Sequence, residues 1–215
     1  MRKVQFANKE YYHIFNRGVD KRDIFVDQKD LGRFFQSMSE FNTLTPTGGI
    51  YAASFRKNNP LRNSVSKSEK LADFICYCLN PNHFHFMIQQ TADRGIEKFM
   101  HRLGLGYSKY FNKKYERSGP LLQGPFKAVR IDSDEYLLHL SAYINLNNKV
   151  HGINSLLYKS SWEEYLEENG KIDEGFCKKD IVFGQFNNID SYKNFAEESL
   201  KNIKERKELE KLLLE

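Results

Sequence analysis

The sequence contains no long apolar run, few cysteines and little net charge. No stretch of its 215 residues approaches the roughly 18 consecutive apolar residues that a membrane-spanning helix needs. The first residues also lack the apolar segment of a secretory signal peptide, so we expect a cytoplasmic protein without a membrane partner. Its three cysteines, Cys76, Cys78 and Cys177, are an odd number, which argues for reduced thiols and against a disulfide framework.

The chain does contain enough apolar material for one substantial core. Hydrophobic residues make up 40% and aromatic residues 14% of the sequence, a composition that argues against a disordered chain. The small net charge of +5 conceals an uneven distribution, because residues 1–160 carry a net +10 and residues 161–215 a net −5. A basic body followed by an acidic tail is typical of a protein that faces a polyanion.

The spacing of apolar residues predicts short strands and amphipathic helices in a definite order. The predicted strands are residues 11–17, 50–55, 72–79 and 83–90 and a strand region within 119–131. The predicted helices are residues 27–42 with Asp27 as N-cap, residues 93–116, and residues 133–150 begun by Ser133. This order fits an α+β fold, a ferredoxin-like antiparallel sheet with helices on one face, followed by a mostly helical acidic tail.

Two segments weaken or complicate this assignment. Gly104 and Gly106 lie in the middle of the predicted helix 93–116, where glycine is unfavourable. Residues 43–70 combine a turn-like start with a polar, loop-like end, and are longer than a bare connection requires. We interpret them as an insert that could set specificity.

The pair His83 and His85 stands on a predicted strand. Side chains alternate between the faces of a strand, so both imidazoles point one way while Phe84 and Phe86 point the other way. Two imidazoles on one face form half of a metal site, although a pair of partly exposed strand histidines is an equally simple interpretation. A hairpin turn at Asn80-Pro81-Asn82 connects this strand to the preceding one.

The preceding strand offers a rival zinc site. Cys76 and Cys78 share one face of it, and a hairpin centred on Asn80-Pro81 would set Cys78 opposite His83 and Cys76 opposite His85. That arrangement would create a Cys2His2 zinc site. The Cys-x-Cys spacing is unusual for a zinc chelate, and cysteine is often only a small buried apolar residue.

Tyr143 and Asn147 are four residues apart on the last predicted core helix and therefore share one helical face. A phenol is a poor nucleophile at its ordinary pKa of about 10, but a nearby cation can stabilise the developing oxyanion. The carboxamide oxygen of Asn147 could help to hold such a cation. Tyr136 lies two turns earlier on the same face and is the second candidate nucleophile.

Basic residues form three groups that could contact phosphates. One group follows the first strand, a second forms a stripe along the predicted helix 93–116, and a third lies in the last strand. In chain order, the candidate DNA-binding residues are Arg17, Lys21, Arg22, Lys98, Arg102, Lys109, Lys113, Lys127 and Arg130. A stripe of this kind can also be an ordinary solvated face, and nearby Phe or Tyr rings could stack unpaired bases.

Four motifs in this order resemble the single-tyrosine transposases, and most closely the REP-associated tyrosine transposases of the HUH (His-hydrophobic-His) nuclease superfamily. The motifs are Tyr12-His13-Ile14-Phe15-Asn16-Arg17-Gly18, Leu79-Asn80-Pro81-Asn82-His83-Phe84-His85, Ser118-Gly119-Pro120-Leu121-Leu122-Gln123-Gly124-Pro125-Phe126-Lys127 and Tyr143-Ile144-Asn145-Leu146-Asn147. The resemblance covers roughly residues 11–152, so we expect a transposase domain over 1–152 and an acidic helical extension over 153–215.

The resemblance implies a metal-dependent enzyme that cleaves single-stranded DNA beside a hairpin or repeat end and rejoins strands. His83, His85 and Asn147 would hold Mg²⁺ or Mn²⁺, and Tyr143 would attack the phosphate to form a 5′-phosphotyrosine. Such a protein would be associated with the nucleoid while bound to DNA, and the sequence leaves open whether it is a monomer or a homodimer. The alternative is a protein of the same fold that binds DNA or RNA hairpins without cutting them.

The sequence departs from the family pattern at two places. Asn148-Lys149-Val150 replaces the usual Pro-Val-Arg after the tyrosine motif, and Pro125 replaces an arginine in the Gly-Arg-Phe/Tyr-Lys run. Neither change alters a candidate catalytic residue, so both concern DNA affinity and hairpin specificity more than chemistry.

Overall fold

The computed structural model describes residues 4–45, 69–153, 155–167 and 175–212. Its elements, in chain order, are β1 (Tyr11–Arg17), the 3-10 helix η1 (Val19–Lys21), α1 (Gln28–Glu40), β2 (Ala72–Asn80), β3 (His83–Gln90), α3 (Gly95–Lys114), β4 (Lys127–Ile131), α4 (Asp134–Asn145), α5 (Asn147–Val150), β5 (Lys159–Ser160), α6 (Trp162–Leu166), α7 (Asp180–Phe183) and α8 (Ile189–Leu212). Within these residues, no helix is long and apolar enough to span a membrane.

The centre of the fold is a five-stranded sheet with the strand order β4-β1-β3-β2-β5. All of its pairings are antiparallel, and β3 lies between β1 and β2. The α+β fold class predicted from the sequence is therefore confirmed. The position of β3 matters for function, because it places His83 and His85 at the centre of the sheet.

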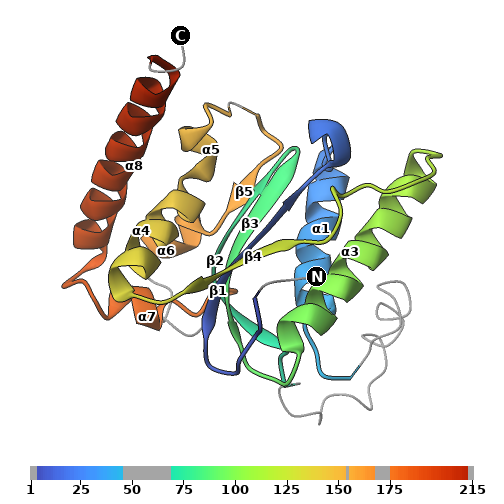
Figure 1. Ribbon diagram of the computed structural model, residues 1–215, viewed down its shortest axis with the longest axis horizontal. Coiled ribbons are helices and arrows are strands. Elements are labelled where there is room, and N and C mark those ends of the chain that lie inside the picture. The colour runs from blue at the N-terminus through green and yellow to red at the C-terminus, as the bar shows by residue number, and fades with distance from the viewer. Residues whose placement is uncertain (1–3, 46–68, 154, 168–174, 213–215) are drawn as a thin grey trace.

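Helices cover both faces of this sheet, whereas the sequence prediction placed them on one face. Helices α1 and α3 pack together on one side, and α4 packs against β2 and β3 on the other side (Figure 1). The cause is the alternation along β3, since the even-numbered rings of Phe84 and Phe86 contact Phe34 of α1. The ring of His85, on the opposite face, instead contacts Tyr143 of α4.

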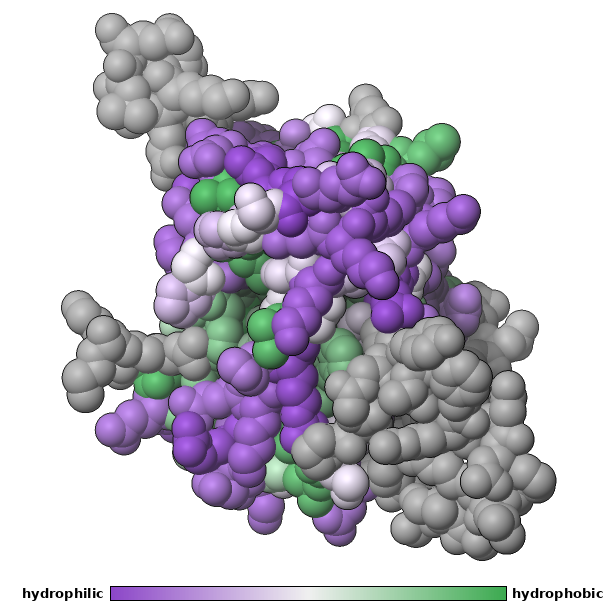
Figure 2. Space-filling model, turned by 90° about the vertical axis from the view of Figure 1, so that its right-hand side faces the viewer, coloured by the Kyte–Doolittle hydropathy of each residue, from purple (hydrophilic) through white to green (hydrophobic). Residues whose placement is uncertain are grey.

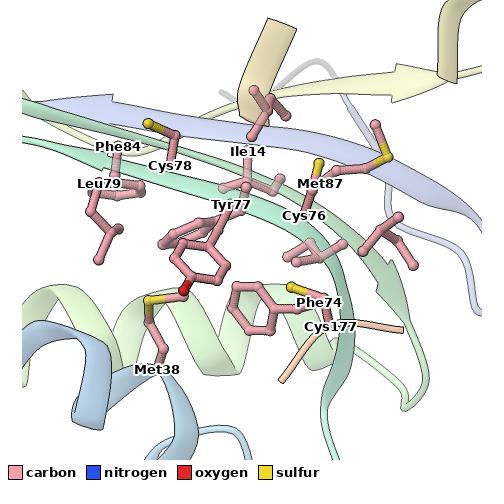
Figure 3. Packing of buried hydrophobic residues seen from close by; sticks show 14 of the residues in the cluster. Ile14, Met38, Phe74, Cys76, Tyr77, Cys78, Leu79, Phe84, Met87 and Cys177 are labelled. Atoms are coloured by element: carbon pink, nitrogen blue, oxygen red, sulfur yellow. The ribbon is translucent and has the colours of Figure 1, made fainter. Parts of the chain in front are cut away.

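Strand β2 also presents side chains to both faces of the sheet, although its register with β3 shifts between Phe74 and Cys76. Figure 3 shows Cys76 and Cys78 pointing away from the layer in which Phe74 and Tyr77 approach Met38 of α1. All of these side chains are buried. Strands β2 and β3 thus have apolar residues on both faces, which is why they form the interior of the sheet rather than its edge.

Most of the predicted elements are confirmed close to their expected bounds. Asp27 caps α1 by accepting a hydrogen bond from the backbone N–H of Asp30 at 2.9 Å, as expected of an N-cap. Only residues 127–131 of the predicted strand region 119–131 form a strand. The predicted strand 50–55 and most of the insert 43–70 lie outside the described residues.

Residues beyond 152 pack on the same core. Strand β5 pairs with β2 at the edge of the sheet, and α8 packs along α4 (Figure 1). Tyr165 of α6 and Tyr192 of α8 are fully buried in the same cluster as the sheet residues. The division of the chain into a domain 1–152 and an extension 153–215 stays a prediction.

Candidate active site

The predicted helix 133–150 is divided into two helices. The hydroxyl of Ser133 accepts a hydrogen bond from the backbone N–H of Tyr136 and begins α4, as predicted. The helix ends at Leu146, whose φ of −107° and ψ of 16° are not helical, and the short helix α5 begins at Asn147. Tyr143 and Asn147 therefore lie on either side of a break, which the four-residue spacing did not reveal.

His83 and His85 share one face of β3, as the sequence predicted. Their ring centroids are 5.3 Å apart, and the Tyr143 ring lies 5.6 Å from the His85 ring. A further ring, that of His151, lies 5.3 Å from His83. The structure thus brings the candidate nucleophile Tyr143, from α4, next to the histidine pair of the central strand β3.

The side chain of Asn147 completes this group. Asn147 is fully buried, and its Oδ1 lies 3.0 Å from Nε2 of His83. Its Oδ1 also accepts a 2.7 Å hydrogen bond from Nδ2 of Asn80, and that same Asn80 nitrogen lies 3.0 Å from His83 Nε2. Among the described residues, Nδ2 of Asn147 has no hydrogen-bond partner. The oxygen of Asn147 is therefore the end of this amide that faces the histidines.

Each histidine of the pair has a partner at its other ring nitrogen. Nδ1 of His83 lies 2.6 Å from Oδ1 of Asn82, and Nδ1 of His85 lies 2.8 Å from Nε2 of His13. An amide oxygen only accepts hydrogen bonds, so the Asn82 contact requires a proton on Nδ1 of His83. In the neutral ring Nε2 then carries the lone pair and can accept from Nδ2 of Asn80. The sequence pattern alone predicts no role in this group for His13 or for Asn82.

Burial sets the protonation of the inner histidines. It lowers the pKa of His13 to about 4. It also lowers the pKa of His85 well below the ordinary value, and the nearby histidines His13, His83 and His151 add to this effect. At neutral pH both rings are therefore uncharged, which is the state in which an imidazole binds a metal.

The phenol of Tyr143 is half-buried and protonated at neutral pH. Burial raises its pKa, an effect that Asn147 partly offsets and that the nearby Cys78 increases. The group therefore needs further help to become a nucleophile. Tyr136, the second candidate, instead lines a groove between α4 and α8 with His139 and Ser199.

The donor set fits a divalent cation bound by nitrogen and oxygen. His83 Nε2 and Asn147 Oδ1, which lie 3.0 Å apart, would each be able to donate a lone pair to the same cation. Neutral imidazole together with an amide oxygen suits Mn²⁺ and is compatible with Mg²⁺. Among the described residues, no three or more His, Cys, Asp or Glu side chains form a metal-binding group, so the amide oxygen is needed to complete the set.

The hairpin register excludes the predicted opposition of cysteines and histidines. The loop is the two-residue turn Pro81-Asn82, so Cys78 lies opposite His85 and Cys76 opposite Met87. The sequence analysis centred the hairpin one residue too early, which moves every pairing by two positions. All three cysteines are free and buried, and burial raises the pKa of Cys78 to about 12, so it is a thiol at neutral pH.

Two of the candidate DNA-binding residues lie beside the histidines. Arg17 pairs with His83 in the sheet register, and its Nε donates to Oε1 of Gln123. Lys127 lies opposite Phe15 on β4, and its Nζ is 6.0 Å from the centre of the Phe15 ring, which stacks on His85. These two cations are thus placed next to the site.

Lys21 and Arg22 lie just beyond β1, at the hairpin end of the sheet. The backbone oxygen of Lys21 accepts a 3.2 Å hydrogen bond from Nδ2 of Asn82. Because Asn82 also contacts His83, this basic loop is linked directly to the histidine pair. Arg22 makes a 3.5 Å ion pair with Asp20.

The remaining candidates lie away from the histidines. Arg130 is paired with Glu10 at 2.9 Å at the outer strand β4. On α3, Nη1 of Arg102 donates to the backbone oxygen of Thr43 at 2.6 Å, and Lys98 lines a groove of about 720 Å³ between α3 and residues 120–126.

Lys109 and Lys113 are exposed on α3. The face on which α3 lies is mostly hydrophilic, with small apolar areas between (Figure 2). Because α3 packs with α1 on the Phe84 side of the sheet, the basic residues of α3 lie on the side opposite the histidine pair.

Some site residues were missed by sequence reasoning. His13 stands in the first motif and, by alternation, shares a face with Phe15, but only the pairing of β1 with β3 brings it to His85. Asn80 and Asn82 were interpreted as turn residues alone. Their amides contact His83 because the turn is only two residues long.

Residues 61–147 match the family of IS200-like transposases. Among curated proteins, none matches the sequence. A solved structure of a REP-associated tyrosine transposase bound to a REP hairpin has a similar fold, with a TM-score of 0.53 and 11% sequence identity over 81% of this chain and 90% of that one. The resemblance to transposases carried by the motifs is thereby confirmed over residues 61–147, the part of the chain that matches the family.

Proposed function

We propose that the protein is a metal-dependent transposase that cuts single-stranded DNA beside a hairpin with Tyr143 and rejoins the strands. The observation that carries the proposal is the meeting of Tyr143, His83, His85 and Asn147 on one face of the sheet. The family match and the similar fold of a transposase bound to a REP hairpin support the choice of DNA.

In the proposed reaction, Oη of Tyr143 attacks the scissile phosphorus. A Tyr–O–P bond forms, the bond from phosphorus to O3′ breaks, and its electron pair stays on O3′, which takes up a proton. The products are a 5′-phosphotyrosyl strand and a free 3′-OH, and attack by another 3′-OH reverses the step and joins two strands. No external energy source is needed, because one phosphodiester bond is exchanged for another.

His83, His85 and Asn147 would hold the cation, Mg²⁺ or Mn²⁺. When bound there, the cation would supply Lewis-acid polarisation of the scissile phosphate and would favour the ionised phenol of Tyr143, whose pKa burial raises. The uncharged state of His85 at neutral pH suits this role, since a protonated imidazole cannot be a ligand.

Arg17 and Lys127 are the two candidate cations that we assign to the DNA strand at the site. Arg17 lies on β1 opposite His83, and Lys127 lies one strand further out, on β4, opposite Phe15. The Phe15 ring stacks on His85, and we assign Phe15 as an aromatic surface on which an unpaired base of the DNA would stack. The stripe on α3 is assigned to duplex or flanking DNA on the other side of the sheet.

The test uses a labelled single strand with a hairpin, incubated with the full chain and Mn²⁺. The wild type is expected to form a covalent protein–DNA adduct that withstands denaturation, and Tyr143→Phe to form none. Tyr136→Phe is the matched control, because it removes the same atom from the same helix and should keep the adduct. Hairpin binding without an adduct at any metal concentration would instead favour the non-cutting hairpin-binding protein.

A further inference from the structure

His13 contacts His85 across the centre of the sheet. Strands β1 and β3 are antiparallel neighbours, and Phe15 of β1 lies opposite His85 of β3. His13 precedes Phe15 by two residues and therefore lies on the same face of the sheet. The two imidazoles are nearly parallel, with ring centroids 5.1 Å apart and an interplanar angle of 23°. Nε2 of His13 lies 2.8 Å from Nδ1 of His85, and both residues are buried.

Two arrangements of the proton are possible in this contact between neutral rings. A neutral imidazole carries one N–H and one lone pair, so one of the two nitrogens donates and the other accepts. If His13 donates from Nε2, His85 accepts at Nδ1 and carries its own proton on Nε2, which then cannot bind a cation. If His85 donates from Nδ1, its Nε2 carries the lone pair.

We propose that His13 is a positioning residue that holds His85 in the tautomer whose Nε2 can bind a metal ion. His13 does so by presenting a lone pair at Nε2 to the Nδ1–H of His85. This inference rests on the proposed function, since it concerns a ligand of the proposed site. It adds a residue of β1 to that site without making it a ligand.

The partner of His83 shows the same arrangement. Oδ1 of Asn82 lies 2.6 Å from Nδ1 of His83 and accepts its proton in a hydrogen bond, which in the neutral ring leaves the lone pair on Nε2. Both histidines thus have a hydrogen-bonding partner at Nδ1, the ring nitrogen that is not proposed to bind the metal. Such partners at the outer nitrogen commonly fix the orientation of metal-binding histidines, and their loss typically weakens metal binding about 10- to 100-fold.

The test is Mn²⁺ affinity, measured from the free-ion signal in electron paramagnetic resonance with the full chain and without DNA. His13→Phe keeps a ring but removes the acceptor, and it should weaken binding about 10- to 100-fold. His13→Gln places an amide oxygen near the position of Nε2 and should stay within about threefold of the wild type. His139→Gln, a histidine on α4 that contacts Ser199, is the matched control and should change nothing.

Two results would overturn the proposal while leaving the metal site intact. One is a His13→Phe protein that binds Mn²⁺ as tightly as the wild type while His85→Ala binds weakly. The other is a His13→Gln protein as weak as His13→Phe, which would mean that ring packing rather than the acceptor matters. Equal binding by wild type and His85→Ala would overturn the metal site itself, and this inference with it.

A second measurement does not depend on whether the variants fold. Nitrogen NMR of the metal-free wild type, labelled at histidine, reads the tautomer of each ring directly. The proposal expects the proton of His85 on Nδ1 and an unprotonated Nε2. A His85 ring with its proton on Nε2 would overturn the proposal.

Discussion

The hydroxyl of Tyr192 in α8 accepts a 2.9 Å hydrogen bond from Nδ2 of Asn145, the last residue of α4. Tyr192 is fully buried, and its hydroxyl also lies 3.1 Å from Oγ of Ser141. The other end of the Asn145 amide accepts a 2.5 Å hydrogen bond from Ser161. Because Asn145 stands midway between Tyr143 on α4 and Asn147 on α5, residues beyond 152 hold the junction between these two helices.

Removing this hydroxyl should therefore destabilise the protein. Tyr192→Phe leaves Nδ2 of Asn145 buried without its acceptor, which we expect to lower the free energy of unfolding by about 1–3 kcal/mol. Urea unfolding of the full chain measures this loss. Tyr158→Phe is the control, since Tyr158 is 37% exposed and should change stability by no more than about 0.5 kcal/mol. Equal losses in the two variants would contradict this account of α8.

Gly104 and Gly106, in the middle of α3, should respond in opposite ways to alanine. A Cβ at Gly106 would lie 2.7 Å from Cε2 of Phe41, so Gly106→Ala should destabilise the protein by about 1–3 kcal/mol through overpacking. A Cβ at Gly104 would meet only Leu122 at 3.8 Å, so Gly104→Ala should stabilise the helix by up to about 1 kcal/mol. Thermal melts of both variants test this pair, and stabilisation by both would show that α1 and α3 are not closely packed at Gly106.

Mild acid should destabilise the protein through its buried histidines. Burial lowers the pKa of His13 from 6.5 to about 4, so between these pH values the unfolded chain binds more protons than the folded one. The free energy of unfolding should then fall as pH drops from about 6.5 to about 4. Urea midpoints of the metal-free protein at pH 7, 6, 5 and 4 measure this slope. His13→Gln should make it shallower, and an unchanged slope would show that His13 does not titrate in this way.

A second pH effect should appear in stronger acid. Burial of the Asp30 carboxylate acts to raise its pKa, but four hydrogen bonds outweigh this and leave the pKa lowered. They come from Lys114, Tyr115, the backbone N–H of Val26 and Tyr110. Its contribution to stability is therefore present above the ordinary carboxyl pKa and is lost as pH falls through the folded value, below about pH 4.

Asp30→Asn tests this effect. We expect it to lower the free energy of unfolding at pH 7 by about 1–3 kcal/mol, and to flatten the pH dependence below about pH 4. The exposed Asp93→Asn should leave both quantities unchanged. If the free energy of unfolding of Asp30→Asn depended on pH as that of the wild type does, the acid effect would belong to other groups.

The elements of this fold were largely predictable from local patterns. The alternation of residues 83–90 predicts the strand β3, and the three- and four-residue spacing of apolar residues in 27–42 predicts the helix α1. Both patterns depend only on residues that are close in sequence, and both predictions are confirmed. The histidine pair on one face of β3 followed from the same alternation.

What could not be predicted depends on contacts between distant segments. The contact of His13 with His85 requires the pairing of β1 with β3, and the opposition of Cys78 to His85 depends on a turn of two residues. The break at Leu146 and the tolerance for Gly106 follow from packing against other elements, which the sequence of one helix does not record.

The most direct test of the central claim is to locate the covalent bond between protein and DNA. The full chain is incubated with a hairpin-bearing single strand and Mn²⁺, digested with nuclease and protease, and mapped by mass spectrometry. The account predicts a nucleotide 5′-phosphate on the peptide that contains Tyr143, at that residue. A phosphate mapped to Tyr136 or to any other residue would contradict it.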